Sequence, residues 1–223
     1  MMDRIPEAEL MEDEEQVKAY AFADFSTAHN LFIETFQQKF SDINSSFNDV
    51  VLDLGCGPCD ITRRFAQAYP DTGFHAVDGS EAMLNYAAGL NEQENLSHRI
   101  KLVQGCLPDF QLPQQFYHLI ISNSLLHHLH DPFVLWETVQ QHAKPYAHVF
   151  VMDLIRPVDE QTVKFLSGEH VKNEADQLKN DFENSLRAAF TLDEVRQQLD
   201  EKGLENLTVE PVSDRHMIIY GIL

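Results

Sequence analysis

Two acids and two glycines in this sequence are spaced as in sites that bind a ribose-containing ligand. Asp53, Gly55 and Gly57 lie at the end of a short apolar run, and Asp78 follows Gly57 by 21 residues. Glycine has no Cβ, so the backbone at these two positions can turn sharply and approach a ligand closely. An acid at the spacing of Asp78 can accept hydrogen bonds from a ribose diol. The pattern therefore indicates nucleotide-type binding.

A strand, a turn and a helix are predicted to position these residues. The apolar run at residues 50–54 predicts a buried strand. A helical pattern follows over residues 59–69, with its apolar side chains on one face. A second strand is predicted at residues 73–77, ending at Asp78. Such a site lies at the carboxyl ends of parallel strands in an open α/β sheet.

The glycine loop departs from the dinucleotide-binding pattern. A third glycine is expected at position 60, where this chain has Asp60, and Pro58 directly follows the second glycine. The run from Asp53 to Pro58 resembles motif I of the class I S-adenosylmethionine-dependent methyltransferases. Residues 78–84 resemble the acidic motif II and the start of its helix. Residues 116–129 resemble the motif IV strand and loop of the family's small-molecule members, and residues 149–153 resemble its fifth strand. The resemblance covers roughly residues 48–155.

The resemblance implies a fold, a cofactor and a set of binding residues. The fold is a Rossmann-like, mostly parallel seven-stranded sheet with a C-terminal antiparallel hairpin and helices on both faces. The cofactor is S-adenosylmethionine, with S-adenosylhomocysteine as product. Asp53 would lie near the amino-acid end of the cofactor and Asn123 near its methionine end. Where family members often have an acid that contacts adenine, this chain has Cys106. The implied cofactor-binding residues are Asp53, Gly55, Cys56, Gly57, Asp78, Gly79, Cys106, Leu107 and Asn123.

A histidine cluster follows the predicted strand at residues 116–122. It contains His127, His128 and His130, next to Asp131. We predict that no metal binds there, because metal ligands usually need a defined spacing and a further partner. Histidine titrates near neutrality, so His127 or His128 is the predicted catalytic base or acceptor contact, with His127 preferred because it comes first after the strand. Further predicted acceptor contacts are Tyr20, Asp153 and Arg156.

The chain divides into a helical lead-in or lid at residues 1–47 and a single domain at residues 48–223. The lead-in is predicted to hold helices at residues 14–25 and 27–40. After residue 156 the pattern predicts two helices, at about 172–188 and 191–202, followed by strands at 205–211 and 215–221. Thr191 and Glu194 are spaced as a capping box, and Gly203 is placed to end the second helix.

Composition narrows the partners and the compartment. The 223 residues carry a net charge of −20 with only 16 Lys and Arg, which argues against nucleic acid and anionic membranes. The chain lacks an apolar run long enough for a membrane span, and its acidic N-terminus does not resemble a signal peptide. Three cysteines without a secretion signal indicate reduced thiols in a cytoplasm. Redox and zinc roles for Cys56 and Cys59 are disfavoured, because no partners complete a four-ligand site.

The favoured function is methyl transfer from S-adenosylmethionine to a small-molecule acceptor by in-line displacement. The sequence leaves the acceptor atom and the oligomeric state open. Three alternatives remain: a non-catalytic S-adenosylmethionine-binding protein, a nicotinamide-dependent oxidoreductase, and a propylamine-transferring relative of the same fold. The oxidoreductase is less favoured because it would have glycine at position 60.

Overall fold

The computed structural model describes residues 2–7, 10, 17–18, 20–21, 23 and 25–223. The predicted helix at residues 14–25 lies largely outside this part of the chain. The elements are α2 (Ser26–Lys39), β1 (Val50–Leu54), α3 (Asp60–Ala68), β2 (Gly73–Asp78), α4 (Glu81–Gln93), β3 (Ile100–Gln104), β4 (Tyr117–Asn123), the 3-10 turn η1 (Leu126–His128), α5 (Phe133–His142), β5 (Ala143–Leu154), α6 (Glu160–His170), α7 (Asp176–Ala188), α8 (Leu192–Glu201), β6 (Thr208–Pro211) and β7 (His216–Ile222).

The strands form one seven-stranded sheet in the order β3-β2-β1-β4-β5-β7-β6. The first five strands are parallel, and β7 runs antiparallel to both β5 and β6. The predicted fold, including the C-terminal antiparallel hairpin, is therefore confirmed. The strand order reverses between β1 and β4, and ligands of such sheets bind at the carboxyl ends of the strands that flank this point.

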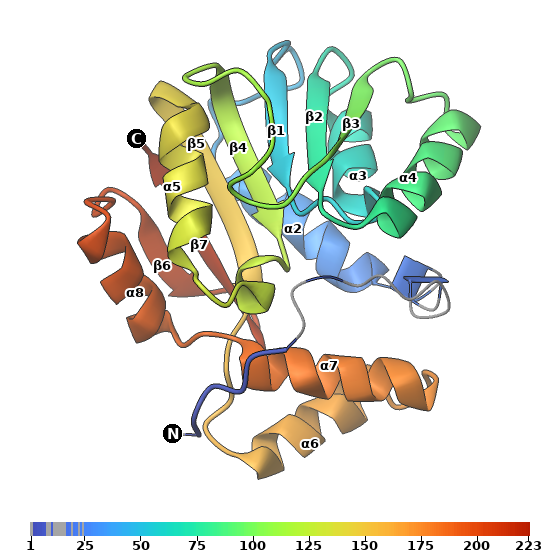
Figure 1. The fold of residues 1–223 in the computed structure, drawn as a ribbon, viewed down its shortest axis with the longest axis vertical. Helices are drawn as coiled ribbons and strands as arrows, with labels where there is room; N and C mark the ends of the chain where they lie inside the picture. The colour runs from blue at the N-terminus through green and yellow to red at the C-terminus, as the bar shows by residue number, and fades with distance from the viewer. Residues whose placement is uncertain (1, 8–9, 11–16, 19, 22, 24) are drawn as a thin grey trace.

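Helices cover both faces of the sheet (Figure 1). On one face α2, α3 and α4 pack into an aromatic core in which Phe36 contacts Phe65 and Phe150 edge to face. On the other face α5 and α8 enclose Trp136, whose indole N–H donates to Gln198 at 3.0 Å. The β1 positions from Val51 to Leu54 are buried on both sides, which explains the near-continuous apolar run there.

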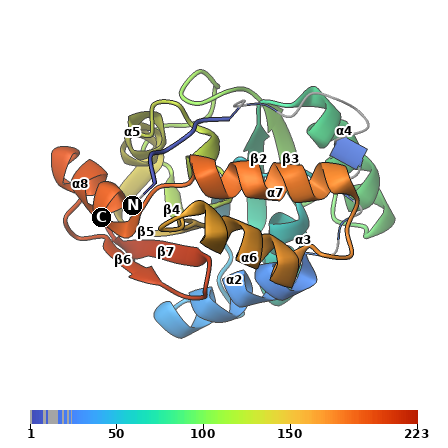
Figure 2. The same ribbon diagram turned by 90° about the horizontal axis from the view of Figure 1, so that it is seen from below.

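A separate pair of helices lies across the carboxyl edge of the sheet. Figures 1 and 2 show α6 and α7 side by side at this edge, and they share a small apolar core with Leu154. The two helices predicted after residue 156 are confirmed as α7 and α8, but the structure has a third helix before them. Helix α6 was missed, although Asp159 caps it by accepting a hydrogen bond from the Thr162 N–H at 2.8 Å.

The residues predicted to begin and end α8 are confirmed. Thr191 and Glu194 form the predicted capping box. Gly203 has φ +66°, the left-handed conformation that ends the helix. Among the described residues, none of the helices combines the length and hydropathy that a membrane span needs.

Candidate active site

The glycine loop between β1 and α3 has the backbone conformation that its sequence predicts. Gly55 and Gly57 have φ of +71° and +49°. A Cβ at Gly55 would lie 2.8–3.0 Å from the Leu125 side chain, so this position also needs glycine for packing. A Cβ at Gly57 would meet nothing within 4 Å. The backbone at Gly57 therefore borders open space that a ligand can fill.

Asp78 connects this loop to the next helix. Its carboxylate accepts the Gly57 N–H and the Ser80 N–H, each at 2.8 Å. Burial raises the pKa of Asp78, and these two backbone donors partly oppose that shift. Ser80 is the N-cap of α4, since its hydroxyl accepts the Met83 N–H at 3.2 Å. One carboxylate thus sets the positions of both the loop and the start of α4.

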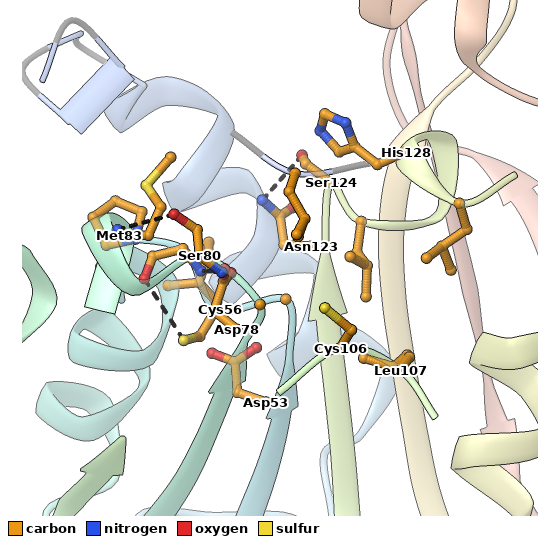
Figure 3. Close-up of a pocket in the computed structure, with 18 of the residues that line it drawn as sticks. Asp53, Cys56, Asp78, Ser80, Met83, Cys106, Leu107, Asn123, Ser124 and His128 are labelled. Atoms are coloured by element: carbon orange, nitrogen blue, oxygen red, sulfur yellow. Dashed lines mark hydrogen bonds between the residues drawn. The ribbon is translucent and has the colours of Figure 1, made fainter. Parts of the chain in front are cut away.

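The loop, Asp78 and the end of β4 enclose a cavity of ≈ 330 Å³, which we call the cofactor cavity. All nine residues predicted from the resemblance to bind cofactor line it: Asp53, Gly55, Cys56, Gly57, Asp78, Gly79, Cys106, Leu107 and Asn123. In Figure 3, Asp53 lies at the bottom of the cavity, Cys106 and Leu107 lie to its right, and Asn123 lies above them. A Cβ at Gly79 would lie 2.9 Å from the Cys106 sulfur, so glycine there keeps this wall close.

Two polar side chains in the cofactor cavity, Asp53 and Asn123, differ in how their hydrogen bonds are satisfied. Asp53 is 2 % exposed and accepts a hydrogen bond from the Thr62 hydroxyl at 2.5 Å, and burial raises its pKa to about 7. The Asn123 amide donates to the Ser124 hydroxyl at 3.2 Å. Its carbonyl oxygen is buried and has no hydrogen-bond partner in the described part of the chain. A buried acceptor without a donor is costly, so this oxygen is suited to a ligand's N–H or O–H.

Asp60 replaces the third glycine of the dinucleotide pattern. Its carboxylate pairs with His29 of α2 and accepts from the Arg64 Nε at 2.8 Å, so it ties the start of α3 to α2. The two buried cysteines of the loop, Cys56 and Cys59, do not form a disulfide. Burial raises the pKa of the Cys56 thiol, which disfavours the reactive thiolate.

A second cavity of ≈ 310 Å³ lies beside the first and is called the acceptor cavity here. It extends from the ends of β4 and β5 to α6 and α7. The residues that line both cavities are Tyr20, His29, Asn123, Ser124 and His128. Its own wall includes His127, Phe182 and Ser185.

His127 is held rigidly by a buried carboxylate. Its Nδ1 lies 2.6 Å from Asp153, which is only 1 % exposed and also accepts the Leu126 and Leu154 N–H groups at 2.7 Å. Burial would lower the pKa of His127, but the charges of Asp153 and Glu7 raise it overall. Burial would raise the pKa of Asp153, yet His127 and the backbone donors lower it overall. Asp153 therefore holds the Nδ1–H tautomer of His127 and turns its Nε2 outward.

Of the three residues predicted to contact the acceptor, one lines the cavities. Tyr20 lines both cavities, and burial raises the pKa of its phenol to about 12. Asp153 and Arg156 line neither cavity, so their predicted contact with an acceptor stays a prediction. Asp153 is enclosed beneath His127. Arg156 is buried, donates to the carbonyls of Met2 and Ala189, and pairs with Glu194 at 2.6 Å.

Sequence reasoning missed most of the acceptor cavity. Its wall contains Asp181 and Phe182 of α7 and the consecutive Arg215 and His216 at the start of β7. Burial lowers the pKa of His216 to about 3, so it is neutral. The Asp159 cap would have located α6. No local signal places Glu7, whose carboxylate lies 3.4 Å from His128 and 3.7 Å from His127.

Comparisons with known proteins agree with this architecture. Residues 51–146 match a family described as a methyltransferase domain. An uncharacterized methyltransferase, YdaC, of Bacillus subtilis (strain 168) is 30 % identical over 86 residues, which are 39 % of this chain and 45 % of the relative. The match thus spans less than half of that relative's length.

Solved structures share the whole fold. A SAM-dependent methyltransferase from Aquifex aeolicus superposes with a TM-score of 0.66 at 18 % identity, covering 95 % of this chain and 99 % of the other. The plantazolicin methyltransferase BpumL, solved with a desmethylPZN analog and SAH, gives 0.71 at 15 % identity, covering 93 % and 90 %. The domain match over residues 51–146, the glycine loop and the strand order together support a class I S-adenosylmethionine-dependent methyltransferase.

Proposed function

We propose that the protein transfers a methyl group from S-adenosylmethionine to a small-molecule acceptor. One observation carries this proposal: the cofactor cavity and the acceptor cavity share a wall at Asn123, Ser124 and His128. A donor in the first cavity and an acceptor in the second would meet at that wall, as an in-line displacement requires. A protein that only binds the cofactor has no need of the second cavity.

The residues of the cofactor cavity fit S-adenosylmethionine. The Asp78 carboxylate is placed for the ribose diol, and the open space at Gly57 accepts a close ligand contact. The Asn123 carbonyl oxygen, which has no partner among the described residues, suits the ammonium or a neighbouring donor at the methionine end. Backbone groups at Cys106 and Leu107 line the position proposed for adenine. When bound, the cofactor supplies a methyl group activated by the positive charge of its sulfonium.

The chain's own contribution is positioning and activation of the acceptor. Because the donor is already activated, the protein needs mainly to orient the two ligands and to accommodate a proton from the acceptor. His128 faces both cavities and His127 faces the acceptor cavity, so we assign acceptor activation to this pair. The net charge of −20 favours metabolites over nucleic acid. The three free cysteines support a reducing, cytoplasmic setting.

Cofactor identity is tested by calorimetry with S-adenosylmethionine, S-adenosylhomocysteine and NADH. We expect binding of the first two only. Asp78→Ala should weaken the binding of S-adenosylhomocysteine by about 1–3 kcal/mol, or roughly 5–150-fold, because a buried polar partner is left unpaired. Asp71→Ala, in the exposed turn before β2, is the matched control. Equal affinity in Asp78→Ala and wild type would exclude the ribose role, and binding of NADH alone would favour the oxidoreductase.

Acceptor class is tested with cofactor carrying an isotopically labelled methyl group. The protein is incubated with separate small-molecule, protein and nucleic-acid fractions of a cell extract, and the label is followed by mass spectrometry. We expect label in the small-molecule fraction. Labelled nucleic acid or protein in its place would refute the acceptor assignment.

A further inference from the structure

Three side chains of types that can bind metal ions lie close together at the edge of the acceptor cavity. They are Glu7, His127 and His128, and one ligand atom from each lies within 4.8 Å of the others. The Glu7 oxygen is 3.7 Å from His127 Nε2 and 3.4 Å from His128 Nδ1. Both separations exceed the usual 2.7–3.2 Å of an N–H···O hydrogen bond. The three ligand atoms therefore converge on one place at the edge of the acceptor cavity.

We propose that Glu7, His127 and His128 bind a divalent transition-metal ion of the zinc or iron type. Nitrogen and carboxylate ligands lie about 2.0–2.2 Å from such ions, so two ligands of one ion are at most about 4.4 Å apart. Both separations to Glu7 fall within that limit, and all three ligand atoms lie within 4.8 Å of one another. Two imidazoles and one carboxylate suit these ions better than magnesium or calcium, which prefer oxygen ligands.

The surroundings of His127 have the form expected around a metal ligand. A ligating histidine usually donates its other ring N–H to a carboxylate, which sets the tautomer and the ring orientation. Asp153 plays this part, with Oδ1 at 2.6 Å from His127 Nδ1. Both Asp153 oxygens also accept backbone N–H groups, which fixes the carboxylate and, through it, the orientation of the His127 ring, with Nε2 on the side of Glu7.

Glu7 is held in place by the segment that carries it. Figures 1 and 2 show this N-terminal segment crossing the end of α7. Arg4 donates to the carbonyls of His127, Leu129 and Ala188, and its guanidinium stacks on Phe190. The Ser185 hydroxyl donates to the Glu7 carboxylate at 2.9 Å. The third ligand thus comes from a part of the sequence 120 residues before His127, which answers the missing-partner argument against a metal.

The described residues supply three ligands there, so such a site would keep coordination positions for a ligand from the acceptor cavity. Under the proposed function, an acceptor oxygen, nitrogen or sulfur atom can occupy such a position. Activation of the acceptor would then come from the charge of the ion, with His127 and His128 as its ligands. Metal binding itself does not depend on the proposed function and is measured without cofactor or acceptor.

The test is calorimetric titration of chelator-stripped protein with ZnCl2 and, separately, CoCl2. We expect one ion per chain and a rise in the melting temperature with added metal, as for any ligand that binds the native state. Glu7→Gln and His128→Ala should each lower the affinity by at least about tenfold, the lower end of what even outer-shell changes cost. His98→Ala, an exposed histidine on a distant loop, should bind as wild type does.

Two results would overturn the proposal. One is wild type that binds no stoichiometric ion. The other is zinc binding that persists in Glu7→Gln and His128→Ala but is lost in Cys59→Ser, which would place the ion at the cysteine pair. Thermal unfolding of each metal-free variant shows whether it is folded. Should one ligand variant fail to fold, the other still decides the outcome, since each removes a ligand.

Discussion

The cofactor cavity and the acceptor cavity share a wall but are assembled in different ways. The cofactor cavity is built mainly from turns that directly follow β1, β2, β3 and β4, so each wall is a strand end in one parallel sheet. The acceptor cavity combines the same edge with α6, α7, the start of β7 and the segment around Tyr20. A repeated local geometry makes the first cavity, and long-range packing makes the second. The two should therefore respond differently to substitution.

The largest expected effect is on the cofactor cavity alone, from Gly57→Val. A β-branched residue is strained at φ +49°, and its side chain would fill the space beside the loop. We expect the loss of measurable S-adenosylhomocysteine binding by calorimetry, with the sheet intact by circular dichroism. The control is Gly89→Ala in α4, where a Cβ meets nothing within 4 Å and φ is not positive. Normal binding by Gly57→Val would show that the loop is not the cofactor site.

The next effect should fall on the acceptor side. His128→Ala and His127→Ala should each lower single-turnover methyl transfer by about 10²–10⁴-fold, whether the imidazole takes a proton or holds an ion. Cofactor affinity should change far less, because neither side chain holds the loop or Asp78. His98→Ala serves as the control. Transfer at the wild-type rate in both variants would indicate an acceptor that is already nucleophilic, such as a thiolate.

A smaller effect should show that Arg156 contributes to stability and not to ligand binding. Arg156→Met should lower the free energy of unfolding by about 1–3 kcal/mol, because its buried guanidinium makes hydrogen bonds to two carbonyls and Glu194. Cofactor affinity should stay unchanged. Arg196→Met, whose side chain is 50 % exposed in a surface pair, should cost less than about 1 kcal/mol. A lower cofactor or acceptor affinity in Arg156→Met would indicate that Arg156 contributes to ligand binding.

The last expected effect is a pH dependence of stability, caused by Asp53 under the glycine loop. Asp53 has its pKa raised to about 7, so the folded state favours its neutral form. Its contribution to stability is complete below the unfolded pKa of about 4 and is lost as pH rises toward 7, at most about 1.4 kcal/mol per pH unit. Asp53→Asn cannot ionise. Urea unfolding should therefore show Asp53→Asn gaining on wild type between pH 5 and pH 8, and an equal difference at both values would contradict the buried, neutral carboxyl.

The sequence predicted the cofactor cavity better than the acceptor cavity. Gly55, Gly57 and Asp78 could be assigned because a strand, its turn and the next strand end are read directly from periodicity and spacing. All nine residues assigned to the cofactor line one cavity. Asp153 and Arg156 were placed at a strand end correctly, but their side chains are enclosed by His127 and by Glu194. The position of a residue at a strand end does not show which way its side chain points.

The sequence by itself determined the alternation of strands and helices, the glycine loop and the acid at the end of β2. These depend on neighbours within a few residues and on the periods of helix and strand. Only the tertiary structure decided the acceptor cavity and the meeting of Glu7 with His127 and His128. Arg4 anchors the N-terminal segment across the end of α7, and buried Asp153 orients His127. The Arg4 contact joins residues 184 positions apart, and the Asp153 contact joins residues 26 positions apart. No local pattern encodes such contacts, because they exist only once the chain has packed.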